Sequence, residues 1–102
     1  MSKYKIEYSR DSKQDLIGIK QYIKYNLQEP KIADNLINKI RDGIEELKDD
    51  PRIYPIIDEE IIKRLEIRKI LIENYIVFYR IKNQTIEIVR IMYGKRNWVS
   101  LL

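Results

Sequence analysis

The stretch RKILIENYIVFYRIKNQTIEIVRIMYGKRNW, residues 68–98, is crowded with Ile, Val, Phe and Tyr, the residue types that favour β-strands. Asn83 and Gln84 interrupt the apolar run and suit a two-residue hairpin turn. That turn would place Arg80 opposite Glu87, which is a favourable cross-strand pair of opposite charges. The stretch therefore predicts three neighbouring antiparallel strands, over residues 68–72, 75–81 and 85–93.

The residues before this stretch predict a short strand and two helices. Residues 4–8 alternate between aromatic or apolar and charged types, and Ser9 and Asp11 follow as candidate helix caps. Pro30 separates two apolar stripes at helical spacing, the second of which covers about 18 residues, or roughly 27 Å of helix. The stripes are Leu16, Ile19, Ile23 and Leu27, then Ala33, Leu36, Ile37, Ile40, Ile44 and Leu47.

The predicted order of elements is β-α-α-β-β-β, with residues 51–60 as an irregular, Pro-containing connection before the late strands. This order favours an α+β fold in which a helical hairpin packs on one face of a small antiparallel sheet. A length of 102 residues fits a single domain over residues 1–102. No signal peptide or long apolar run is found, so we expect a cytoplasmic protein without a membrane span.

Two missing residue types exclude much familiar chemistry. The chain has no Cys and no His, so it has no thiol nucleophile, no Ser-His-Asp triad and no His- or Cys-ligated metal. Catalysis would have to use Lys, Arg, Tyr, Asp or Glu. The three glycines are isolated and form no phosphate-binding loop. The acidic pairs Asp49-Asp50 and Glu59-Glu60 fit solvated positions better than Mg²⁺ ligands, so we expect neither a metal nor a cofactor.

The excess of positive charge lies in the second half of the chain. Residues 1–50 hold ten basic and ten acidic residues, whereas residues 51–102 hold ten basic and six acidic ones. This asymmetry indicates an acidic or phosphate-bearing partner on one side, with a solvated basic face as the alternative. Aromatic residues lie beside the basic ones, a combination that suits nucleic acid. The basic residues are Lys63, Arg64, Arg68 and Lys69, then Arg90, Lys95 and Arg96, near Tyr93 and Trp98.

Both faces of the predicted late hairpin are apolar, although two helices can cover only one of them. An exposed apolar face usually marks a partner site, which is the interpretation we favour; cover by the tail, residues 98–102, or by a second copy is the alternative. Simple alternation assigns one face Ile76, Phe78, Val89 and Ile91, and the other face Val77, Tyr79, Ile81, Ile86, Ile88 and Met92.

The ordered set of motifs resembles the RelE/ParE superfamily, the toxins of type II toxin–antitoxin modules, over nearly the full chain. Arg68 precedes a Y-x-V-x-Y run at residues 75–79, and I-x-I-x-R-I follows at residues 86–91. Tyr93-Gly94-Lys95-Arg96 closes the pattern. The resemblance implies one of two activities: RelE-like cleavage of mRNA on the ribosome, or ParE-like poisoning of DNA gyrase.

The resemblance can be tested position by position against the RelE-type catalytic set. Arg96 and Lys69 match that set, whereas Ile67, Ile76 and Leu102 stand where it has a Lys, an Arg and a Tyr. Because these departures would remove phosphate stabilisation and a stacking or proton-handling group, they favour the ParE-like branch. In the RNase alternative, the catalytic residues would be Lys69, Arg90 and Arg96.

Both activities imply a cognate antitoxin, and a third hypothesis is a non-toxic nucleic-acid-binding domain. We expect the antitoxin to be amphipathic and acidic, and to lay a helix in a groove or to add a strand. Its predicted contacts are Val77, Tyr79, Ile88 and Met92. The predicted contacts with the target, DNA gyrase or the ribosome and its mRNA, are Tyr93, Lys95, Arg96 and Trp98.

Overall fold

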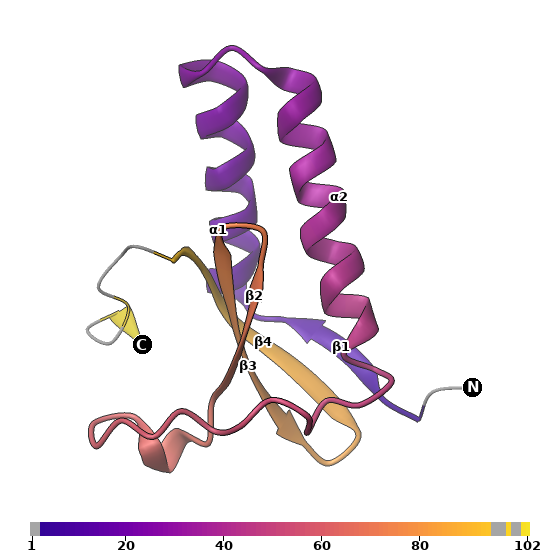
Figure 1. Cartoon of the computed structure of the whole chain (residues 1–102), viewed down its shortest axis with the longest axis vertical. Coiled ribbons are helices and arrows are strands. Elements are labelled where there is room, and N and C mark those ends of the chain that lie inside the picture. Colours follow the sequence, from indigo (N-terminus) through magenta and orange to yellow (C-terminus); the bar gives the residue numbers. More distant parts are fainter. Residues whose placement is uncertain (1–2, 95–97, 99–100) are drawn as a thin grey trace.

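The computed structural model describes residues 3–94, 98, 101 and 102, and it confirms the predicted order of elements (Figure 1). A π-helical turn, η1 (Tyr22–Asn26), continues the first helix, and a 3₁₀ turn, η2 (Lys63–Leu65), precedes the late strands. The helices and strands are β1 (Lys5–Tyr8), α1 (Arg10–Gln21), α2 (Pro30–Glu46), β2 (Arg68–Ile72), β3 (Tyr75–Lys82) and β4 (Thr85–Tyr93).

The sheet has the strand order β1-β4-β3-β2 and is mixed. β2, β3 and β4 form the predicted antiparallel meander, with Asn83 at φ 58° in its turn. Arg80 Nε donates to Glu87 Oε1 at 2.7 Å, as the predicted register requires. β1 pairs in parallel with β4, so the prediction of a wholly antiparallel sheet is wrong for this pairing. Parallel neighbours need a long crossover connection, which the intervening helices, β2 and β3 supply.

The helical hairpin covers one face of the sheet and forms what we call the main core. Ser9 caps α1, because its Oγ accepts from the backbone N–H of Ser12 at 3.0 Å. α2 begins at Pro30, as predicted, and turns its apolar stripe toward the strands. The buried members of the main core are Leu16, Ile37, Ile40, Ile44, Leu47, Val77, Tyr79, Ile86, Ile88 and Ile91.

The opposite face of the sheet is covered by the chain itself, so the interpretation of that face as an exposed partner site is wrong. Phe78 is fully buried there and the ring centroid of Trp98 lies 5.2 Å from its own. The tail alternative named from the sequence is correct, but the connection before β2 contributes as well. This second core buries Ile57, Ile62, Ile67, Phe78 and Met92, with Ile76, Val89, Trp98 and Leu102 packed against it.

A β-bulge in β4 changes which face its last residues occupy. Phe78 pairs with Arg90, whereas Tyr79 pairs with Ile88, so Val89 is an extra residue on β4. An extra residue shifts a strand of period two by one position. Ile91 therefore lies in the main core and Met92 in the second core, which reverses the faces predicted for both.

Candidate functional site

Asp15 of α1 and Arg90 of β4 form a paired contact that joins the first helix to the sheet. Arg90 Nε donates to Asp15 Oδ2 at 2.8 Å, and Arg90 Nη2 donates to Asp15 Oδ1 at 2.9 Å. The Asp15 side chain is 14% exposed and that of Arg90 is 21% exposed. The hydrogen bond with Asp15 raises the pKa of Arg90, although burial acts in the opposite direction. The positively charged guanidinium of Arg90 therefore serves to join β4 to α1.

The same carboxylate completes an open edge of the sheet. β1 ends at Tyr8, which pairs with Ile88, so β4 continues beyond its parallel neighbour. Ser9 Oγ donates to the carbonyl of Val89 at 2.8 Å, and the backbone N–H of Ile91 donates to Asp15 Oδ2 at 2.9 Å. Side chains from the start of α1 therefore satisfy backbone groups that a longer β1 would have paired.

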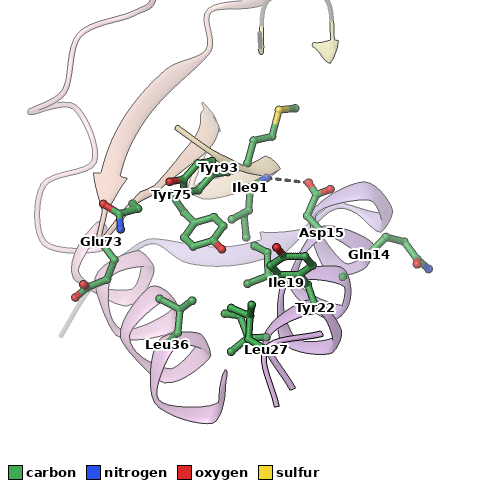
Figure 2. Close-up of a pocket in the computed structure, with 14 residues that line it drawn as sticks. Gln14, Asp15, Ile19, Tyr22, Leu27, Leu36, Glu73, Tyr75, Ile91 and Tyr93 are labelled. Carbon is green, nitrogen blue, oxygen red and sulfur yellow. Dashed lines mark hydrogen bonds between the residues drawn. The ribbon is translucent and has the colours of Figure 1, made fainter. Parts of the chain in front are cut away.

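A groove of about 840 Å³ opens beside this contact, between the helices and the part of the sheet where β3 begins and β4 ends. Figure 2 shows its lining side chains, with the hydrogen bond between Asp15 and Ile91 at one border. We call it the tyrosine groove. Its lining residues are Gln14, Asp15, Gly18, Ile19, Tyr22, Ile23, Leu27, Leu36, Glu73, Asn74, Tyr75, Ile91, Met92 and Tyr93.

Three tyrosines approach one another in this groove. The rings of Tyr75 and Tyr93 meet edge to face, with centroids 5.6 Å apart and an interplanar angle of 68°. Tyr22 points toward them from the helix (Figure 2). Burial raises the pKa of Tyr75, and the neighbouring hydroxyls of Tyr93 and Tyr22 raise it further. The Tyr75 hydroxyl therefore stays protonated at neutral pH, and it can both donate and accept a hydrogen bond.

A smaller hollow of about 310 Å³ lies on the opposite side of the sheet, beside the second core. Lys69 Nζ stands 4.8 Å from the centroid of the Trp98 ring, a cation–π distance. Asp58 and Glu59 also line this hollow. The indole of Trp98 therefore contacts both Phe78 and Lys69.

Of the residues predicted for RNA cleavage, Lys69 and Arg90 both stand in register with Phe78, on the two strands beside β3. Lys69 contacts the Trp98 ring, Arg90 is paired with Asp15, and Arg96 lies outside the described residues. Of the predicted target contacts, Tyr93 is 40% exposed at the tyrosine groove and Trp98 is partly buried in the second core. Lys95, like Arg96, lies outside the part of the chain that the structure describes.

The residues predicted to contact an antitoxin are buried by the chain's own elements. Val77, Tyr79 and Ile88 lie in the main core, beneath the helices. Met92 was expected on the same face but lies in the second core, because of the bulge at Val89. A contact of an antitoxin with these four side chains stays a prediction, and it would require displacement of the present cover.

Sequence reasoning missed Asp15, Tyr22, Tyr75 and Glu73 as site residues. Asp15 directly precedes the buried Leu16 on α1. Nothing in the local sequence indicates that its partner is Arg90, 75 positions later. The tyrosines carried a usable signal, since the chain has eight of them and only one phenylalanine. Tyrosine in place of phenylalanine indicates aromatic positions with one end in contact with water or polar groups.

Among the described residues, no group of three or more acidic side chains could hold a metal ion. Neither helix in the part that the structure describes is long and apolar enough to cross a membrane.

One family model matches the chain. The model of the family described as "ParE toxin of type II toxin-antitoxin system, parDE" matches residues 6–98. No curated protein matches the chain. A solved structure of the chromosomal ParDE toxin–antitoxin system from P. aeruginosa is similar, with a TM-score of 0.75, 19% identity, and coverage of 90% of this chain and 97% of that chain.

The toxin–antitoxin complex RelBE2 from Mycobacterium tuberculosis is similar as well, with a TM-score of 0.58, 17% identity, and coverage of 88% of this chain and 96% of that chain. At these identities the structural likeness supports the fold alone. The family assignment rests on the sequence match, which extends from residue 6 in the first strand to residue 98. The chain therefore belongs to the ParE toxin family of type II toxin–antitoxin systems.

Proposed function

We propose that this chain, taken as one domain over residues 1–102, is a toxin that arrests growth by binding and poisoning DNA gyrase in the cytoplasm. We also propose that a cognate antitoxin binds and neutralises it. The observation that carries the proposal is the ParE family match over residues 6–98. The similar structures from P. aeruginosa and M. tuberculosis both come from toxin–antitoxin systems, which supports the antitoxin as a partner.

The arrangement of the cations supports a binding role over ribonuclease chemistry. A ribonuclease without His would need cationic side chains free to meet phosphate and the developing charge. In Arg90, however, Nε and Nη2 donate to the Asp15 carboxylate, and Nη1 donates to the carbonyl of Leu101 at 3.3 Å. Ile67, which stands where the RelE-type set has a Lys, is 3% exposed. These features leave RNA cleavage as the less favoured alternative.

The proposed contact with gyrase is the C-terminal segment, through Tyr93, Lys95, Arg96 and Trp98. The described part of this segment supports that assignment in two ways. Tyr93 is exposed at the end of β4, and the Trp98 ring lies 5.2 Å from that of Phe78, centroid to centroid.

The test has a cellular and a biochemical part. We expect that induction of the chain stops growth and that co-expression of its antitoxin restores it; normal growth with soluble chain present would instead favour the non-toxic hypothesis. Purified chain is then incubated with the host's gyrase, ATP and supercoiled plasmid, and linear DNA trapped by gyrase is measured. We expect linear product with the wild type and little with Arg96→Ala.

Arg64→Ala serves as the matched control, because Arg64 is an exposed arginine of η2 in the connection before β2. It should trap as much linear DNA as the wild type. Full supercoiling by an active gyrase in the presence of the toxin would reject the gyrase proposal. Cuts in mRNA on the ribosome, lost in Lys69→Ala, would then establish the RelE-like alternative.

A further inference from the structure

One flank of the first helix carries a row of cations. Positions 10, 13, 17, 20 and 24 repeat at helical spacing and therefore lie on one face of α1 and of η1, which continues it. All five residues are exposed, four are basic and none is acidic. We call them the α1 row: Arg10, Lys13, Ile17, Lys20 and Lys24.

Three cations of the α1 row have no acidic partner. Within the part of the chain that the structure describes, Arg10, Lys13 and Lys24 form no ion pair with a carboxylate. Lys20 Nζ lies 3.5 Å from Asp34 Oδ1, and the two side chains are 50% and 62% exposed. The row therefore presents at least three unmatched positive charges to solvent.

The α1 row borders a groove of about 1000 Å³ between α1 and α2. Three members of the row line it from α1, and Arg41 lines it from α2. Arg41 also forms no ion pair with a described carboxylate. The two carboxylates of this groove are matched, Asp34 by Lys20 and Glu45 by Lys48 at 2.9 Å. The groove thus adds a fourth unmatched cation beside the row.

The charge balance of the sequence hides this surface, because the first half of the chain has no net charge. Residues 1–41 hold nine basic and five acidic residues, whereas residues 42–50 hold one basic and five acidic ones. The acidic stretch includes the end of α2 and the turn after it. Figure 1 shows that the joined ends of the two helices project beyond the strands, away from this acidic end. A large partner can therefore approach the α1 row from solvent.

We propose that the α1 row and Arg41 bind the phosphate backbone of duplex DNA, so that the toxin contacts the DNA held by gyrase as well as the enzyme. The inference adds DNA as a partner, and it rests on the proposed function only for the source of that DNA. The length of the row selects this occupant. From residue 10 to residue 24 the helix rises roughly 21 Å, the length of roughly six base pairs, and a duplex presents phosphates along all of it.

The test measures the affinity of the purified chain for a fluorescently labelled duplex of about 20 base pairs, without gyrase, at about 50 to 200 mM salt. Each phosphate contact contributes about 0.9 to the slope of log affinity against log salt concentration. The row variant, Arg10→Gln with Lys13→Gln and Lys24→Gln, should therefore lower this slope by about 2.7. Over the fourfold salt range, the wild type should lose about 40-fold more affinity than the row variant.

A second triple variant controls for net charge. It replaces three exposed cations of the connection, η2 and the end of β3 by glutamine, so its net charge equals that of the row variant. Its slope should match that of the wild type. The replacements are Arg52→Gln, Arg64→Gln and Lys82→Gln. Circular dichroism verifies that each variant is folded; Lys24→Gln alone, with a slope lower by about 0.9, carries the test if the row variant is not.

Equal slopes for the row variant and the control variant would overturn the inference. The gyrase assay adds a second readout, in which the row variant should need about tenfold more toxin than the wild type to trap the same amount of linear DNA. Weaker trapping with an unchanged slope would overturn the inference in favour of gyrase itself as the partner of the α1 row. No trapping by the wild type would reject the proposed function, while the slopes would still decide the contact with DNA.

Discussion

Replacement of Asp15 by alanine tests how strongly the first helix is tied to the sheet. The variant leaves the guanidinium of Arg90 and the N–H of Ile91 without the three hydrogen bonds that Asp15 accepts at 2.8–2.9 Å. Removing one member of a buried pair costs about 3–5 kcal/mol, because the other charge stays uncompensated. Arg90 keeps some contact with water, at 21% exposure, so we place the loss at the lower end, about 3 kcal/mol.

The loss is measured by urea unfolding of chain purified away from its antitoxin. A loss of about 3 kcal/mol would lower the melting temperature of a domain of this size by about 12 °C or more. Glu7→Ala is the control, because Glu7 pairs with Lys5 at 3.9 Å and both side chains are well exposed. It should cost less than about 0.5 kcal/mol. If Asp15→Ala costs no more than Glu7→Ala, the assignment of this pair as a structural tie is refuted.

Three further predictions concern stability. Gly18→Ala should raise the free energy of unfolding by about 1 kcal/mol in thermal unfolding, because alanine is the better helix former. Gly43→Ala should give no such increase, because its Cβ would lie 2.6 Å from Cδ1 of Ile72. Burial raises the pKa of Tyr79 from 10.0 to about 12, so the unfolded chain releases this proton first and the free energy of unfolding falls as the pH rises from about 10 to about 12. Urea unfolding at stepped pH should give a shallower decline for Tyr79→Phe. Trp98→Ala should lower the free energy of unfolding by about 2 kcal/mol in the same assay, because it uncovers the second core; an unchanged value would show that the tail contributes nothing to this cover.

The sequence predicted those features that depend on local chemistry. The limits of β2 and β4 matched to the residue, because turn residues bound a run of β-formers on each side. The cover of the second face could not be predicted in the same way. Ile57, Ile62 and Ile67 lie in an irregular connection, where apolar residues follow neither the helical nor the strand period. The tie between Asp15 and Arg90 has no local signal, since it depends on tertiary packing.

The bulge left no clear signal in the sequence. Apolar residues occupy both faces of β4, and Ile88 lies in the main core while Val89 packs on the second core, as both would in a regular strand. The extra residue is shown only by the pairing, in which Phe78 faces Arg90 and Tyr79 faces Ile88. Strict alternation across Val89 therefore misplaced Ile91 and Met92, while the residues before the bulge were assigned correctly.

The same extra residue also builds the tyrosine groove. Tyr79 pairs with Ile88, and an unbroken antiparallel register from that pair would set Tyr75 opposite Met92. With Val89 inserted, Tyr75 pairs with Tyr93 instead, and the two rings meet edge to face at the mouth of the groove. The shift also aligns the N–H of Ile91 with Asp15. One residue in β4 thus sets both the aromatic rim of the groove and the contact with Asp15 that holds α1 beside it.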